Sequence, residues 1–258
     1  MRSRERPIRS TPSTSGTAED QIFAQPRAVT DFDFGAETAA VFDDMLARSV
    51  PFYAEVERMV AEMAADFAAP GTTIYDLGCS TCNTALRIAE LVPPDRDLRF
   101  VGIDSSPEML DLARQKLEAG KFPFPYELMQ ADLNHGVEIA NASAVLLVLT
   151  LQFIRPLYRD RLIEKIRRGL SEEGCLILVE KVLGESSTFN RLFIKHYYEL
   201  KRRHGYSELE IAQKREALEN VLVPYRLEEN RELLMRHGFG QVDVFFKWYN
   251  FCALVAMK

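Results

Sequence analysis

The sequence predicts an α/β protein with a Rossmann-like fold, in which a mostly parallel sheet of seven strands ends in an antiparallel hairpin and carries added helices. Three observations predict it. Residues 73–84 read as a buried strand, a tight loop at Gly78 and the start of a helix. From residue 73 to 181, short apolar strands alternate with helices, which is typical of a parallel sheet covered on both faces. Two strand patterns near the C-terminus are joined by a short link at 248–250, and so short a link implies an antiparallel pair.

The elements before the first strand are a tail and two helices. Residues 1–30 are rich in Arg, Ser, Thr and Pro and show no apolar period, so we expect a disordered tail. Ordered structure is expected to begin near Phe32, and a chain of 258 residues suits a single domain, here residues 31–258. Amphipathic helices are predicted at 37–49 and 51–68, the second with Pro51 in its first turn.

The sheet is predicted from residue 73 onwards. Five strands are expected at 73–77, 98–104, 126–130, 143–150 and 175–181, with helices at 84–91, 107–119 and 158–170. Turn signals separate them, including residues 171–174 before the fifth strand. Residues 187–222 then read as a helical insertion interrupted at 204–206, followed by a helix at 227–237 and strands at 242–247 and 251–257. This is the architecture of class I S-adenosylmethionine-dependent enzymes, the methyltransferase-like superfamily.

The loop after the first strand predicts a nucleotide-like ligand without phosphates. The N–H groups of the loop and of the helix start face the ligand at this point of an α/β sheet. A dinucleotide fingerprint needs three glycines, G-x-G-x-x-G, whereas here Gly78 is followed at alternate positions by Ser80 and Cys82. Without those glycines nothing permits a pyrophosphate to approach closely, which argues against NAD and ATP.

Carboxylates near the ends of the first three strands are the candidate ligand contacts. Asp104 is predicted to bind both ribose hydroxyls; the alternative is a cap of the following helix. Asp132 is predicted to recognise an adenine amino group, with Leu133 packed on the ring, unless it is an ordinary turn residue. Asp76 is expected to order loop amides or to meet the ligand's amino group rather than to perform acid–base chemistry.

Composition and charge exclude several classes of function. A net charge of −6 disfavours a broad nucleic-acid surface, and the apolar run 144–151 is too short to span a bilayer. The charged N-terminus has no apolar leader, so we expect a cytoplasmic protein with free thiols. Cys79 and Cys82 are interpreted as small residues filling a tight loop. A redox or zinc motif is the less favoured alternative, because no second pair of metal ligands is present, and no metal is expected.

The sequence shows no evident general base. No Ser/His/Asp arrangement, carboxylate pair or histidine cluster is present. The chemistry is therefore expected to come from the cofactor, with the protein supplying orientation and electrostatics. Aromatic faces can hold a sulfonium cation, and Tyr53, Tyr206 and Tyr225 are candidates; ordinary packing is the alternative for each.

Seven short segments carry a resemblance to a known family. They are residues 45–53, 75–80, 103–109, 150–153, 180–181, 205–220 and 250–251, of which Gly-Tyr-Ser-Glu-Leu-Glu at 205–210 is the most specific. Together they resemble the carboxy-S-adenosyl-L-methionine synthases of bacterial wobble-uridine modification in tRNA, from about Phe32 to Lys258.

The resemblance implies a homodimeric transferase that binds S-adenosylmethionine and carboxylates its sulfonium methyl with prephenate. A base released from prephenate removes a methyl proton, and the resulting ylide captures carbon dioxide, leaving phenylpyruvate. By the same resemblance Tyr53 and Arg215 are catalytic. Arg215, supplied by the neighbouring subunit, would bind the added carboxylate through its planar fork. The implied cofactor site comprises Tyr53, Asp76, Gly78, Cys79, Ser80, Asp104, Ser105, Asp132, Leu133, Val148 and Arg215.

The sequence departs from this family at two places. The family's loop continues into a Gly-containing stretch, whereas Thr81-Cys82-Asn83 follows here, and Val148 stands where the family carries an Asn that contacts the ligand. Loss of that amide removes a polar contact worth about 1 kcal/mol or more. Two alternatives therefore stay open: a small-molecule methyltransferase or another S-adenosylmethionine-converting paralogue, and a non-catalytic cofactor-binding protein.

Overall fold

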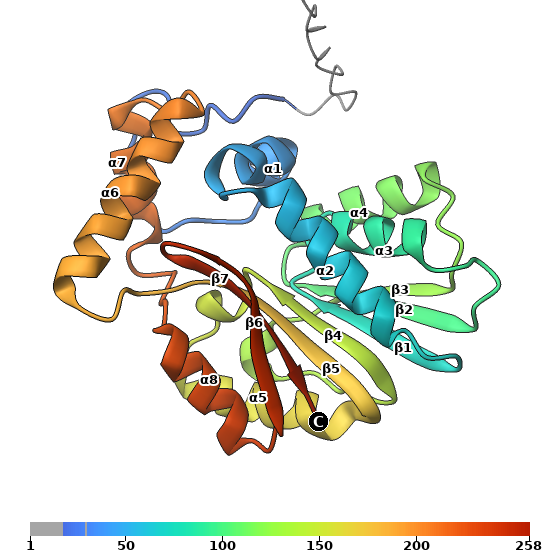
Figure 1. Ribbon diagram of the computed structural model, residues 1–258. Helices are drawn as coiled ribbons and strands as arrows, with labels where there is room; N and C mark the ends of the chain where they lie inside the picture. Colours follow the sequence, from blue (N-terminus) through green and yellow to red (C-terminus); the bar gives the residue numbers. More distant parts are fainter. Residues whose placement is uncertain (1–17, 29) are drawn as a thin grey trace, which may run out of the picture.

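The computed structural model describes residues 18–28 and 30–258, and a seven-stranded sheet forms its centre (Figure 1). The strand order is β3-β2-β1-β4-β5-β7-β6. Strand β7 is antiparallel to β5 and β6, and the other neighbours are parallel. This confirms the predicted sheet and its C-terminal hairpin. The strands are β1 (Thr72–Leu77), β2 (Leu98–Asp104), β3 (Tyr126–Gln130), β4 (Ala142–Val148), β5 (Leu170–Lys181), β6 (Gln241–Trp248) and β7 (Phe251–Met257).

Helices cover both faces of the sheet, because successive strand residues point into two different cores. On one face Ile74 and Ile177 belong to a core that also contains residues of α2, α3 and α4. On the other face Leu147 and Leu178 share a core with α5 and α8. These helices are α2 (Tyr53–Phe67), α3 (Asn83–Leu91), α4 (Pro107–Ala119), α5 (Pro156–Gly169) and α8 (Leu227–Arg236).

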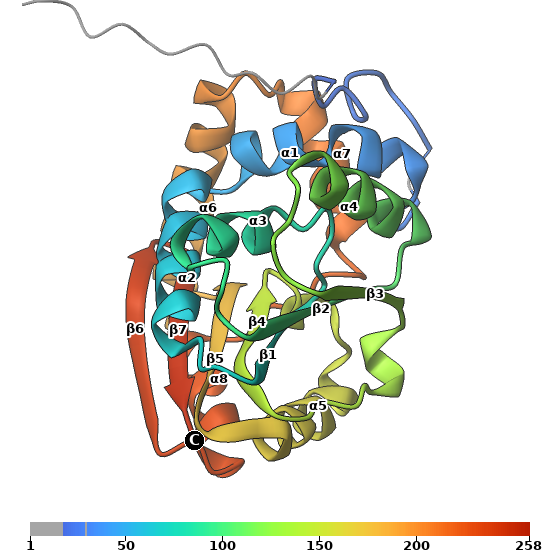
Figure 2. The same ribbon diagram turned by 90° about the vertical axis from the view of Figure 1, so that its right-hand side faces the viewer.

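Three further helices gather beyond the carboxyl ends of the parallel strands, as Figure 2 shows. They are α1 (Ala36–Ser49), α6 (Ser187–Arg203) and α7 (Glu208–Leu218). The predicted insertion at 187–222 is therefore two helices and ends at Leu218. Its break is set by Gly205, which has a φ of +89°, and by Ser207, which starts α7 with a capping box to Glu210. Ligands of open α/β sheets bind at this end of the strands.

Three predicted boundaries were wrong, each for a local backbone reason. Helix α2 begins at Tyr53 and not at Pro51, because Phe52 adopts a left-handed conformation with a φ of 52°. Strand β4 ends at Val148 and not at Thr150, because Leu149 has a φ of 57°. The predicted turn at 171–174 lies inside β5, where the pairing with β4 shifts register between Ala142 and Ala144.

The described part of the chain begins earlier than the expected start of order near Phe32. Asp20 and Phe23 are buried, at 2% and 7% exposure. The Gln213 side chain in α7 fastens this segment by donating to the carbonyls of Phe23 and Gln25, at 2.9 Å each. Single anchoring residues leave no periodic pattern, so the segment resembles a tail in sequence. The rest of the predicted tail, residues 1–17 and 29, lies outside the described residues.

None of the helices within 18–28 and 30–258 is long and apolar enough to cross a membrane.

Candidate functional site

A cavity of about 250 Å³ opens at the carboxyl ends of β1, β2, β4 and β5. The strand order reverses between β1 and β4, and this switch point is where α/β sheets bind ligands. Ten of the eleven predicted cofactor-site residues line this cavity: Tyr53, Asp76, Gly78, Cys79, Ser80, Asp104, Ser105, Asp132, Leu133 and Val148.

The loop after β1 is held against β2 in a strained conformation. Gly78, Ser80 and Cys82 have φ angles of 79°, 45° and 59°. The backbone N–H groups of Gly78 and Cys79 donate to the carbonyl of Ile103, at 2.7 and 3.0 Å. A Cβ on Gly78 would lie 2.4 Å from Thr150 Oγ1, so this position requires glycine for both its backbone angle and its space.

Cys82 has a left-handed conformation at the place where the family pattern is expected to contain glycine. Cys82 precedes α3 with a φ of 59°, a conformation that glycine adopts at little cost and that favours a Gly-containing stretch. Its side chain is buried beside Cys79, which fits the interpretation of small residues filling a tight loop. Within the described ranges no group of three or more His, Cys, Asp or Glu could hold a metal ion.

Asp104 organises the loop from the end of β2. Its Oδ2 accepts from the N–H of Ser80 at 2.9 Å, and its Oδ1 accepts from the N–H of Ser106 at 3.0 Å. Burial raises the pKa of Asp104, while the amides of Ser106 and Ser80 oppose that rise. The following helix is capped by the side chain of Ser106 and not by Asp104. The capping alternative for Asp104 is therefore wrong, and its carboxylate lines the cavity.

Asp76 is a buried carboxylate at the same end of the cavity. Its burial, followed by the charges of Asp104 and Glu57, raises its pKa to about 7. The structure assigns no loop amide to its side chain, because Asp104 and the Ile103 carbonyl receive those N–H groups. Of the two expected roles for Asp76, ordering the loop is therefore wrong, and a contact with a cationic part of the ligand remains the prediction.

Asp132 and Leu133 follow β3 in the short 3-10 turn η1 (Leu133–His135). Asp132 Oδ1 accepts from the N–H and the side-chain amide of Asn134, at 2.9 and 2.8 Å. These are the bonds of a turn residue, and the adenine contact of Asp132 stays a prediction. Asp132, Leu133 and Asn134 nevertheless line the cavity together, and the polar turn faces the ligand space.

Of the three tyrosines proposed for a sulfonium cation, only Tyr53 lines the cavity. Burial is the main reason why the pKa of Tyr53 lies well above its ordinary value, and the carboxylate of Glu57 raises it further. The ring of Tyr206 lies 4.2 Å from the Arg48 guanidinium, and the ring of Tyr225 lies 4.1 Å from that of Arg159. Those two rings already face a cation of the chain itself, so their proposed role was wrong.

Arg215 does not line the cavity of its own chain. Its side chain is 60% exposed on α7, and its nearest carboxylate is that of Glu216, at 3.8 Å. The neighbouring residue, Lys214, points inward and lines the cavity. The position of Arg215 leaves it available to another molecule.

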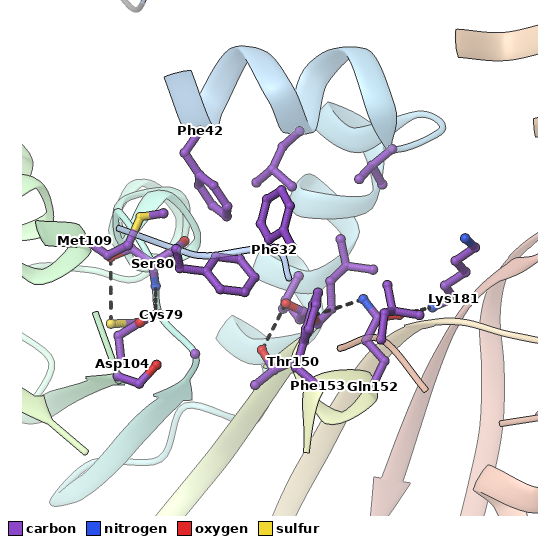
Figure 3. Close-up of a pocket in the computed structure, with 18 of the residues that line it drawn as sticks. Phe32, Phe42, Cys79, Ser80, Asp104, Met109, Thr150, Gln152, Phe153 and Lys181 are labelled. Atoms are coloured by element: carbon purple, nitrogen blue, oxygen red, sulfur yellow. Dashed lines mark hydrogen bonds between the residues drawn. The ribbon is translucent and has the colours of Figure 1, made fainter. Parts of the chain in front are cut away.

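Sequence reasoning missed an aromatic wall and two lysines of the cavity. Phe34 contacts Phe32 and Phe153 with ring centroids 5.1 Å apart in both pairs, and these rings cover the cavity beside Phe42. Figure 3 shows Cys79 and Asp104 at one end of the site and Lys181 at the other, with Thr150, Gln152 and Phe153 between them. Phe32, Phe34 and Phe42 come from the N-terminal segment and α1, where no strand end or motif spacing marks them, whereas Phe153 lies in η2, within the 150–153 segment of the family resemblance.

A buried arginine fixes the segment after β4 that forms the middle of the cavity. Arg159 is 1% exposed, and its Nε donates to the carbonyl of Ile154 at 2.9 Å. Its Nη2 donates to the carbonyls of Gln152 and Val223, at 3.4 and 2.6 Å. Five fixed N–H donors allow one side chain to hold several carbonyls, so Arg159 positions the 3-10 turn η2 (Leu151–Phe153).

Comparison with known proteins identifies the relatives of this chain. A family model described as "Methyltransferase domain" matches residues 74–174. The chain is 60% identical over 242 residues to the carboxy-S-adenosyl-L-methionine synthase of Methylococcus capsulatus, covering 93% of this chain and 100% of that protein. It is 42% identical over 240 residues to the synthase of the same name from Desulfotalea psychrophila, covering 93% and 97%.

Solved structures share the fold at low sequence identity. An O-methyltransferase family protein from Burkholderia thailandensis superimposes with a TM-score of 0.60 and 16% identity, over 86% of this chain and 60% of that chain. Human N-acetylserotonin methyltransferase in complex with SAM gives a TM-score of 0.56 and 16% identity, over 86% and 55%. This chain spans less than two thirds of those longer proteins, and the similarity concerns the fold.

Proposed function

This chain belongs to the carboxy-S-adenosyl-L-methionine synthase family, and we propose that it carboxylates the sulfonium methyl of S-adenosylmethionine with prephenate. Its fold is that of class I S-adenosylmethionine-dependent methyltransferases. The observation that carries the proposal is identity of 60% across the full length of a synthase, together with one cavity that gathers ten predicted cofactor contacts.

The residues of the cavity fit a nucleoside that carries a positive charge. We propose that Asp104 receives the ribose hydroxyls, since its carboxylate lines the cavity and is held by two amides. Asp132 and Leu133 are proposed for the adenine ring, and Asp76 for the amino group of the methionine part. Tyr53 is proposed to face the sulfonium, because a buried aromatic ring attracts a cation. One domain from residue 31 to 258 is proposed as well, since residues from Phe32 to Phe251 line the same cavity.

In this proposal the chain supplies binding, orientation and exclusion of water, and the base comes from the second substrate. Asp76 and the cavity lysines carry charges that bind the ligands, and Tyr53, whose pKa is raised, is protonated at neutral pH. S-adenosylmethionine supplies the methyl group, and prephenate supplies both carbon dioxide and the hydroxide that takes the methyl proton. Phenylpyruvate and water then account for the remaining atoms.

The proposed reaction is tested by mass. Purified protein is incubated with S-adenosylmethionine and prephenate, and the nucleoside products are weighed. A nucleoside heavier than the substrate by one carbon dioxide is expected, together with phenylpyruvate in equal amount. If the cofactor binds and no such nucleoside forms, carboxylation with prephenate is excluded.

A methyltransferase is the second candidate function, and Val148 favours it. This half-buried side chain lines the cavity at the end of β4, where the family pattern has an amide. A methyl acceptor would need no polar contact there. The same incubation with a candidate acceptor separates the two, because methyl transfer leaves S-adenosylhomocysteine as the nucleoside.

We propose a homodimer in which Arg215 of one subunit binds the added carboxylate in the cavity of the other. Arg215→Ala is then expected to weaken binding of the carboxylated product by about 30-fold and that of S-adenosylmethionine by less than about two-fold. Calorimetric titration of both ligands measures this, with Arg203→Ala on α6 as the matched exposed control. Equal losses for both ligands would return Arg215 to a structural role.

Mixing two variants distinguishes a contribution between subunits from one within a subunit. Arg215→Ala and Asp104→Asn are each expected to be inactive, but their mixed dimer retains one cavity with both Asp104 and a partner arginine. An equal mixture with exchanged subunits should therefore recover about a quarter of wild-type activity. No recovery, although subunit exchange is demonstrated, would place Arg215 outside the partner's site.

The affinity for S-adenosylmethionine is expected to fall as the pH decreases below about 7. Asp76 has a raised pKa of about 7, so its carboxylate becomes neutral below that pH and loses its attraction for the ligand's ammonium group. Titrations between about pH 6 and 7.5 measure this while the cavity lysines, whose pKa values are about 8, remain largely charged. Asp76→Asn should bind weakly with little pH dependence; a variant that keeps the wild-type profile would exclude Asp76 as the titrating group.

The biological setting is proposed from the family resemblance. The carboxylated product would serve wobble-uridine modification in tRNA, carried out by another enzyme. All four cysteines are free and buried, which supports a reducing compartment such as the cytoplasm.

A further inference from the structure

Three lysines from separate elements are buried together at the end of the cavity away from Asp104. Lys181 is the last residue of β5, Lys201 belongs to α6 and Lys214 to α7. Lys201 and Lys214 are each 5% exposed, and Lys181 is partly buried. Lys181 and Lys214 line the cavity, and Figure 3 shows Lys181 at the opposite end from Asp104. Two members of this lysine cluster are therefore part of the wall of the ligand space, and Lys201 lies beside them.

Two tyrosine rings hold the three ammonium groups close to one another. The Nζ atoms of Lys181 and Lys201 lie 4.9 and 5.1 Å from the centre of the Tyr197 ring. The Nζ atoms of Lys201 and Lys214 lie 5.7 and 5.6 Å from the centre of the Tyr206 ring. Aromatic faces stabilise cations, so the rings permit a concentration of positive charge that apolar side chains would not.

The cluster has more positive than negative charge. Lys214 Nζ lies 3.6 Å from Asp20 Oδ2 and 3.3 Å from Ser49 Oγ. For Lys181 and Lys201, the structure gives no acceptor within hydrogen-bonding distance of Nζ among residues 18–28 and 30–258. Among the described residues, Asp20 is therefore the one carboxylate within 4 Å of any of the three ammonium groups, and Asp44 acts on Lys214 from farther away. Nearby, Arg48 lies over the Tyr206 ring and is paired with Asp44 and Glu19.

Buried ammonium groups without an anion are costly. The cost is reflected in their pKa values: burial lowers those of Lys181 and Lys214 to about 8, and burial with the charges of Lys214 and Lys181 holds the pKa of Lys201 well below its ordinary value. An anion in the cavity would remove this cost. A cavity with carboxylates at one end and ammonium groups at the other suits two ligands of opposite charge.

We propose that Lys181, Lys201 and Lys214 form a carboxylate-binding subsite for the second substrate. That substrate would be a small organic acid with two carboxylates, of which one is transferred and the other is held by the lysine cluster. This inference rests on the proposed function for its second substrate, and it adds the residues that anchor that substrate. Lys181 and Lys214 contact the ligand, and Lys201, which does not line the cavity, adds its positive charge from a position 5.1 Å from the centre of the Tyr197 ring.

The carboxylate in the methionine part of S-adenosylmethionine is the other anion available to the lysine cluster. The cluster favours the second substrate because Lys181 ends β5, on the far side of β4 from the Gly78 loop that positions the nucleoside. The two sources predict different losses when a lysine is removed, and binding measurements separate them.

Lys181→Met tests the subsite, because methionine keeps the length of the side chain and Lys181 has no carboxylate partner that would be left unpaired. Prephenate is titrated calorimetrically into protein saturated with S-adenosylhomocysteine, and S-adenosylmethionine is titrated separately. Prephenate should bind about 30-fold more weakly to the variant, while the affinity for S-adenosylmethionine changes by less than about two-fold. Lys181→Arg should restore most of the prephenate affinity, and Lys195→Met, an exposed lysine on α6, should behave as wild type.

Each contrary outcome is informative. If S-adenosylmethionine binding weakens as much as prephenate binding, the cluster holds the methionine carboxylate and the proposal is wrong. Unchanged binding of both ligands in folded Lys181→Met protein would also overturn it. If wild-type protein binds prephenate through Lys181 but forms no carboxylated nucleoside, the subsite stands and the proposed reaction fails.

Discussion

Replacing Gly78 by alanine is expected to lower the free energy of unfolding by about 2–5 kcal/mol and to abolish binding of S-adenosylmethionine. Two effects add at this position. The φ of +79° disfavours any side chain, and the new Cβ would lie 2.4 Å from Oγ1 and 2.6 Å from Cγ2 of Thr150. The loop would have to move away from the cavity to relieve the contact. Chemical denaturation and calorimetric titration measure the two losses.

Gly71→Ala is the matched control for that prediction. Gly71 precedes β1 with a similar φ of +72°, but its Cβ would meet nothing closer than Asp97 Oδ2, at 3.8 Å. Its substitution should lower the free energy of unfolding only by the cost of a side chain in the left-handed conformation, about 1–2 kcal/mol, and leave ligand binding intact. Thr150→Ala in the Gly78→Ala background should recover part of the loss. Equal costs at Gly71 and Gly78 would show that the contact with Thr150 has no effect.

Asp104→Asn is expected to weaken binding of S-adenosylmethionine by about 100-fold while changing the free energy of unfolding by less than about 1 kcal/mol. A carboxylate accepts from two hydroxyls more strongly than an amide does. Stability should change little, because the amide oxygen can still accept from Ser80 or Ser106 and the burial cost of a charge is removed. Asp111→Asn on the exposed face of α4 is the control.

A ligand analogue shows whether Asp104 contacts the ribose. Wild-type protein should bind 2′-deoxy-S-adenosylmethionine more weakly than S-adenosylmethionine, whereas Asp104→Asn should discriminate little between them. Discrimination of the same size in both proteins would mean that Asp104 acts only on the loop.

The order of the elements and most of the nucleoside end of the site could be predicted from the sequence. Strand ends are visible as apolar runs followed by polar residues, and parallel strands bring their carboxyl ends to one edge. Gly78, Asp104 and Asp132 follow three such runs, and all three line the cavity. The conformation of the loop at Cys82 was harder to predict, because a left-handed cysteine carries no sequence signal of its own. Its positive φ is the kind of conformation that favours glycine, which fits the glycine of the family pattern.

The opposite end of the cavity could not be predicted in this way. Lys181, Lys201 and Lys214 lie in segments with ordinary helix and strand patterns, where a lysine usually faces solvent. Asp20, their single carboxylate partner, lies in a segment that resembles a disordered tail in sequence.

The sequence by itself determined the fold, the nucleoside-binding strand ends and the family, because periodicity and short motifs are local properties of the chain. Only the tertiary structure decided which tyrosine lines the cavity, that Arg215 points outward, and that three lysines and one aspartate meet at one end of the cavity. Those properties depend on which side chains from distant segments meet, and on the burial and charge that each then experiences.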